Sequence, residues 1–131
     1  MTRRAIVAGI GHTDFSKDSG RTELELSVEA IHAALQDAGV EPGEVQGVTT
    51  FTFDSSPEDE IARSLGFGPL QFFAESPFAG GGGCATVMYA AMAVEAGVAD
   101  VVVCYRGLNE RSGRRFGRTE RSDPVGIRSM V

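Results

Sequence analysis

The strongest chemical signature in the sequence is a glycine run that stands directly before an apolar segment. The run consists of four consecutive glycines (Gly80, Gly81, Gly82 and Gly83) followed by Cys84. Residues 84–96 contain one charged residue, Glu95, and are typical of a buried helix. Glycine lets a ligand approach the free amides of the first helical turn, where the helix dipole favours negative charge. The pattern predicts a site for an enolate or tetrahedral oxygen, and its alternative is a flexible linker.

Few other side chains have the pattern of a reactive site. Cys84, Cys104, His12 and His32 lack the spacing of metal ligands or of a disulfide framework, so we expect no metal site. Cys84 is either a nucleophile or a small apolar core residue, and its apolar neighbours favour the core. Both histidines are interpreted as surface or core residues. The glycines match neither a dinucleotide-binding motif nor a P-loop, so no cofactor is expected.

The elements that must position the glycines alternate along the chain. We expect strands at 4–9, 45–53, 70–74 and 100–105, a helix from the Thr22–Glu25 capping box to Gly39, a short helix starting at Ser56-Pro57, and a helix at 84–96. This order predicts an α/β fold, βαβαβαβ, with a mainly parallel sheet. The third helix is apolar on all sides and should be buried on nearly all of them, which requires a second layer from a longer polypeptide or an oligomer.

Charge and composition narrow the class of protein. The formal net charge of the 131 residues is −6, although seven arginines follow residue 105. Because these arginines alternate with glycine and serine, without base-stacking aromatics, we expect no nucleic-acid binding. The sequence has no membrane-spanning stretch and no signal peptide at its start, so we expect a cytoplasmic protein that does not bind membranes.

Several motifs resemble the N-terminal half of the thiolase superfamily, in its sterol-carrier-protein branch. They are Gly9–Phe15, Ser27–Val48 and Gly97–Val103. Within that branch, a second set of motifs resembles the actinobacterial lipid-transfer-protein aldolases, which shorten steroid side chains. That set comprises Thr49–Asp54, Cys84–Val87, Ala90–Val94, Asn109–Gly113 and Arg115–Gly117.

The resemblance implies a layered αβαβα fold, of which residues 1–117 form the N-terminal half and 118–131 an arginine-rich irregular tail. Counted back from Gly97, the position of the thiolase cysteine falls on Gly80, so the family nucleophile is absent. The resemblance therefore implies a lyase that cleaves a β-hydroxyacyl-CoA steroid side chain into a 17-ketosteroid and propionyl-CoA. Its proton-transfer residues are expected in the other half, so this chain alone should be inactive. Tyr89 and Tyr105 are interpreted as packing residues.

Two alternatives to the lyase remain open. One is a degradative thiolase (acetyl-CoA acetyltransferase) that uses Cys84, and the other is a non-catalytic subunit of a thiolase-like assembly. The resemblance also implies two protein partners: a second copy that pairs along residues 70–76, at Phe72 or Phe73, and an OB-fold accessory domain of a hydratase subunit. The substrate itself carries CoA, and the arginine-rich tail is expected to face its phosphates or the accessory domain.

Overall fold

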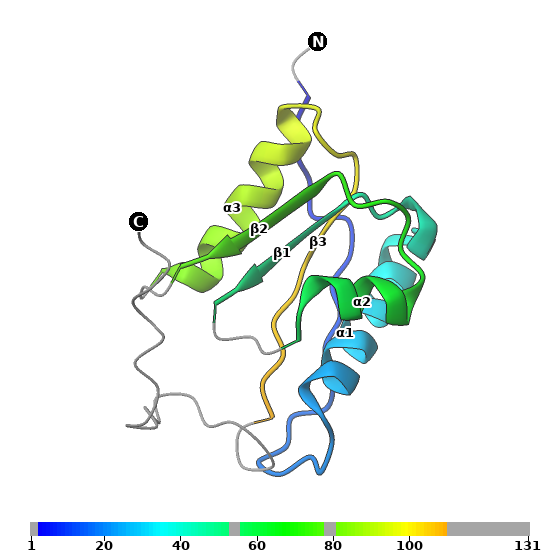
Figure 1. The fold of residues 1–131 in the computed structure, drawn as a ribbon, viewed down its shortest axis with the longest axis vertical. Coiled ribbons are helices and arrows are strands. Elements are labelled where there is room, and N and C mark those ends of the chain that lie inside the picture. The colour runs from blue at the N-terminus through cyan, green and yellow to red at the C-terminus, as the bar shows by residue number, and fades with distance from the viewer. Residues whose placement is uncertain (1–2, 53–55, 78–80, 110–131) are drawn as a thin grey trace.

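The computed structural model describes residues 3–52, 56–77 and 81–109. Its elements, in chain order, are α1 (Glu23–Ala38), the 3-10 helix η1 (Pro42–Glu44), β1 (Gly47–Phe51), α2 (Glu58–Leu65), β2 (Phe72–Ser76), α3 (Gly82–Glu95) and β3 (Val102–Cys104). The strands form one parallel sheet in the order β2-β1-β3. α3 covers one face of the sheet, and α1 and α2 lie on the other (Figure 1). The predicted α/β fold with a parallel sheet is confirmed.

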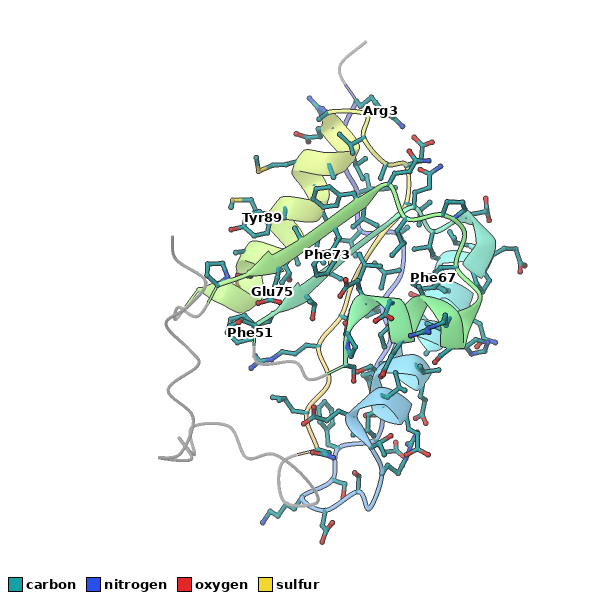
Figure 2. All side chains as sticks on the ribbon, in the orientation of Figure 1. Arg3, Phe51, Phe67, Phe73, Glu75 and Tyr89 are labelled. Carbon is teal, nitrogen blue, oxygen red and sulfur yellow. The ribbon has the colours of Figure 1, made fainter. Side chains whose placement is uncertain are left out.

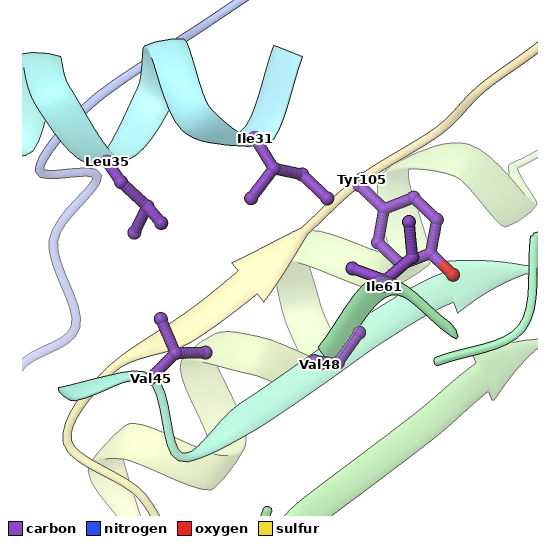
Figure 3. Packing of buried hydrophobic residues seen from close by; sticks show 6 residues of the cluster. All are labelled: Ile31, Leu35, Val45, Val48, Ile61 and Tyr105. Carbon is purple, nitrogen blue, oxygen red and sulfur yellow. The ribbon is translucent and has the colours of Figure 1, made fainter. Parts of the chain in front are cut away.

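The hydrophobic core lies between the sheet and the layer of α1 and α2 (Figure 3). It is built from Ile31, Leu35, Val45, Val48, Ile61 and Tyr105. The central strand β1 is buried along its whole length, as expected for a parallel strand with helices on both faces. The core therefore fixes β1, and with it the position of the strand's last residue, Phe51.

Helix α1 has the boundaries that the sequence predicts. The backbone amide of Glu25 donates to Thr22 Oγ1 at 3.1 Å, and the amide of Thr22 donates to Glu25 Oε2 at 2.8 Å. These two bonds form the predicted capping box and satisfy two amides that the helix start leaves free. Gly39 ends the helix with a φ of 66°, a left-handed conformation that glycine adopts without strain.

The predicted strand at residues 4–9 is wrong. This segment lies outside the three-stranded sheet, and the side chain of Ile6 is 83% exposed. Polar contacts hold both of its ends, since Arg3 pairs with Asp100 and the Ile10 amide donates to Asp37 at 2.9 Å, and Gly9 lies against Ala34 and Ala38 of α1. The apolar run predicts burial on both faces, but the described residues supply no layer that covers Ile6.

The other predicted elements form with shifted ends. β1 and β3 are shorter than expected, and β2 lies two residues later in the chain. Pro57 caps α2 instead of occupying its first turn. Helix α3 begins at Gly82, two residues earlier than expected, so Gly82 and Gly83 belong to its first turn. These shifts matter most at α3, because they place part of the glycine run inside the helix.

Among the residues that the structure describes, helix α3 is covered on one side only. Ala90 and Ala93 are buried against the sheet, whereas Val87, Met88 and Met92 are exposed, Met92 to 60%. The expected burial on nearly all sides is therefore not reached within the described residues, and the second layer stays a prediction. None of the helices in the described ranges is long and apolar enough to cross a bilayer.

Candidate functional site

The candidate site is the start of α3, where the carboxyl ends of β1 and β2 point (Figure 1). Gly81 is the N-cap, and Gly82, Gly83 and Cys84 follow in the first turn. Gly80, also predicted for this site, lies outside the described residues. Gly81, Gly83 and Cys84 are exposed, whereas Gly82 is buried. The first turn therefore presents bare backbone on its outer side, where a ligand oxygen can approach the helix end that carries the positive dipole.

Gly82 sits where no side chain fits. A Cβ atom at this position would overlap Phe51 Cε2 and would lie 2.9 Å from the Pro77 carbonyl oxygen. Of the described atoms, the same Cβ at Gly81 would meet none within 4 Å, and at Gly83 it would meet the Arg106 guanidinium at 3.9 Å. Glycine at 82 thus serves packing against Phe51, while glycine at 81 and 83 keeps the backbone open.

The described residues do not bury Cys84. Its side chain is exposed in the first turn of α3, so the interpretation as a core residue, like the burial of the whole helix, is not met within them. The apolar residues around Cys84 belong to both sides of α3, and the described residues bury one of these sides. The Cys84 amide donates to Gly81 O at 3.1 Å, which closes the first turn.

Two threonines fix α3 against the sheet. Thr49 Oγ1 on β1 donates to Thr86 O at 3.1 Å, and Thr86 Oγ1 donates to Gly83 O at 2.7 Å. Cys104 Sγ on β3 lies 3.8 Å from the same Thr86 carbonyl, and burial raises the pKa of this thiol. The sequence analysis missed this set, since its members come from three elements. These hydrogen bonds fix the position of the first turn of α3 relative to β1.

Arg106 is a further candidate residue, which the sequence pattern does not single out among the seven arginines after residue 105. Its Cζ atom lies 4.8 Å from the centroid of the Phe51 ring. It follows β3 by two residues, so it leaves the sheet at the same edge as the start of α3. The position just after a parallel strand is the signal that could have found it, because binding residues gather at that edge of α/β sheets.

The other predicted residues lie away from the first turn of α3. His12 is exposed, stacks on Phe15 at 5.7 Å between ring centroids and lines a cavity together with Arg106. His32 is exposed on α1. Tyr105 is buried and its hydroxyl donates to Ser56 O at 2.5 Å, which confirms a packing role. Tyr89 is half-buried on α3. Within the described ranges, no cluster of three or more His, Cys, Asp or Glu side chains could hold a metal ion.

β2 is an edge strand of the described sheet, as expected for residues 70–76. Phe73 is 42% exposed on it, and Phe72 is half-buried. The side chain of Phe73 lies on β2 away from Phe51, which stands at the start of α3 (Figure 2). Pairing with a second copy along this edge stays a prediction.

A comparison with solved structures identifies the class of fold. A solved acetyl-CoA acetyltransferase from Syntrophomonas wolfei matches with a TM-score of 0.64 over 88% of this chain and 34% of that chain, at 21% identity. No family model matches the chain. The chain has the thiolase-like α/β fold, as the sequence resemblance implied.

The relatives are more specific. A 17-hydroxy-3-oxo-4-pregnene-20-carboxyl-CoA lyase from Mycobacterium tuberculosis is 53% identical over 97% of this chain and 34% of its own length. A steroid side-chain-cleaving aldolase from Thermomonospora curvata is 57% identical over 86% of this chain and 29% of its own length. The solved Ltp2-ChsH2(DUF35) aldolase matches with a TM-score of 0.82 and 56% identity over 86% of this chain and 30% of that chain. The chain is thus a close homologue of steroid side-chain-cleaving aldolases and spans about a third of the curated relatives' length.

Proposed function

We propose that the protein to which this chain belongs is a carbon–carbon lyase that cleaves a β-hydroxyacyl-CoA steroid side chain into a 17-ketosteroid and propionyl-CoA. The identity of 53% and 57% to a lyase and an aldolase of steroid side chains supports the reaction. The observation that carries the proposal is the exposed backbone of Gly81 and Gly83 at the start of α3, because a retro-aldol step needs stabilisation of an oxyanion and no protein nucleophile.

The chemistry divides into two proton transfers around one bond cleavage. A base removes the proton of the β-hydroxyl group, the bond between the α- and β-carbons breaks, and the ketone leaves. The electron pair of that bond becomes the thioester enolate, whose oxygen accepts hydrogen bonds from the first turn of α3. Protonation of the α-carbon then releases propionyl-CoA. One well-placed donor to such an oxygen is worth about 3 kcal/mol.

Product analysis of the full-length protein tests the proposal. We expect equal amounts of propionyl-CoA and of a steroid with an intact ring ketone, formed without added CoA. Products that require free CoA would contradict a retro-aldol cleavage. A stable complex with a partner but without any turnover would instead favour a non-catalytic subunit.

A thiolase that uses Cys84 is the second candidate function. The exposure of Cys84 in the first turn of α3 supports it, because a nucleophile must reach the substrate. Replacement of Cys84 by alanine separates the two candidates. The lyase keeps its activity in this variant, whereas a thiolase loses it.

The partners are part of the proposal. We propose a homodimer that pairs along β2, where an exposed Phe73 would be covered. We also propose an OB-fold accessory domain of a hydratase subunit, supported by the match to the solved Ltp2-ChsH2(DUF35) aldolase. The protein would work in the cytoplasm, where Cys84 and Cys104 stay reduced.

Sedimentation tests the proposed β2 interface in the full-length protein. A monomeric F73K variant, compared with a dimeric wild type, would support this interface. Unchanged dimerisation of this variant would refute it.

A further inference from the structure

Arg106 stands over the glycine-bearing turn of α3. Its Cζ atom lies 4.8 Å from the Phe51 ring centroid, and its Nη1 atom lies 3.9 Å from the point where a Cβ of Gly83 would be. Arg106 is exposed, so its guanidinium is within reach of a ligand. A delocalised cation and the amino end of a helix thus lie side by side, and both favour negatively charged oxygen.

Phe51 sets the place of this guanidinium. The ring is 4% exposed at the end of β1, and its edge fills the space that the missing side chain of Gly82 leaves. An arginine over an aromatic face gains a cation–π attraction that restricts where its planar group lies. Because the same ring contacts both Arg106 and the first turn of α3, the distance between these two positive groups is fixed by the core.

Ser76 supplies an independent sign of a polar ligand. It is fully buried at the end of β2, and its Oγ atom has no hydrogen-bond partner among the described residues. Ser76 is the register partner of Phe51, so its side chain lies on the same, α3-facing side of the sheet. A buried hydroxyl without a partner is costly to keep. Its place beside Phe51 aims it at the start of α3.

We infer that Arg106 binds the thioester oxygen of the acyl-CoA substrate and donates to it as the enolate forms. The inference rests on the proposed lyase function and deepens it. The guanidinium and the α3 amides share one oxygen, and Ser76 lies at the base of that site. A CoA phosphate is the other negatively charged group of the substrate that a guanidinium binds. The second experiment below distinguishes it from the thioester oxygen.

The test compares R106Q with R63Q in the full-length protein. Arg63 is a matched control, because it is also an exposed arginine and lies on α2, away from the start of α3. We expect R106Q to lower kcat about 100-fold, the effect of losing one oxyanion donor, and R63Q to change it less than about twofold. We also expect R106Q to slow the exchange of the α-protons of propionyl-CoA with deuterated water, because that exchange passes through the same enolate. A melting temperature close to that of the wild type shows that R106Q folds.

A pantetheine substrate distinguishes binding of Arg106 to the thioester oxygen from binding to a CoA phosphate oxygen. S-propionyl-pantetheine lacks the CoA phosphates, so a thioester contact predicts the same loss of exchange with this compound as with propionyl-CoA. A defect that is confined to KM and vanishes with the pantetheine substrate would assign Arg106 to a phosphate and overturn the inference. Unchanged kcat in R106Q would also overturn it while leaving the lyase intact. Absence of cleavage by the wild type refutes the proposed function itself.

Discussion

Replacement of Gly82 by alanine tests the geometry on which the site depends. The new methyl group would overlap Phe51 Cε2 and lie 2.9 Å from Pro77 O. Phe51 is buried in the sheet, so it cannot move away without disturbing β1. Overpacking of this kind costs about 1–3 kcal/mol, whereas the higher helix propensity of alanine returns at most about 1 kcal/mol. We therefore expect a net loss of stability.

The matched control is G83A in the same turn. Alanine at Gly83 would lie 3.9 Å from the Arg106 guanidinium and would overlap nothing. Both variants gain the same helix propensity, so the difference between them isolates the overlap at Gly82, about 1–3 kcal/mol. The melting temperatures of the two full-length variants, measured in one buffer, give its sign. A G82A protein as stable as G83A would refute the packing of Phe51 against α3.

Three further predictions concern the scaffold. Y105F removes the buried hydrogen bond to Ser56 O and should lower the free energy of unfolding by about 1–2 kcal/mol, read from the urea midpoint. Hydrogen bonds from Thr22 lower the pKa of Glu25, so the stability advantage of the wild type over E25Q should be present at neutral pH and disappear as the pH falls through that lowered pKa, as followed by thermal melts across the acid range. Cys104 is exposed as a residue, but its sulfur faces the Thr86 carbonyl, and partial burial of the thiol raises its pKa. Alkylation of Cys104 in a C84S variant, measured by mass spectrometry, should therefore be slower at neutral pH than that of a freely exposed thiol and should speed up as the pH rises.

The exposed side of α3 shows a feature that the local sequence pattern does not predict. Met88 and Met92 belong to a run that is apolar on all sides, which predicts a helix without a solvent face. The structure exposes them, because the described residues place a sheet on one side of α3 and nothing on the other. Ile6, in the predicted first strand, is exposed for the same reason. Periodicity reports that such side chains need burial, but it does not say whether the covering layer lies in the same chain.

The sequence by itself determined those features that depend on neighbouring residues. The capping box of Thr22 and Glu25, the end of α1 at Gly39 and the alternation of strands and helices all follow from local hydrogen bonding and side-chain spacing. The glycine run likewise marked the start of α3, since bare backbone before an apolar helix has a direct physical meaning.

Only the tertiary structure decided which residues surround that helix start. Ser76 and Arg106 are far from Phe51 in the sequence, and both lie next to it because parallel strands end at one edge of the sheet. The apolar neighbours of Cys84 predict a core residue, whereas its exposure depends on which side of α3 packs against β1. Such contacts are set by the packing of whole elements, which no local pattern of residue types encodes.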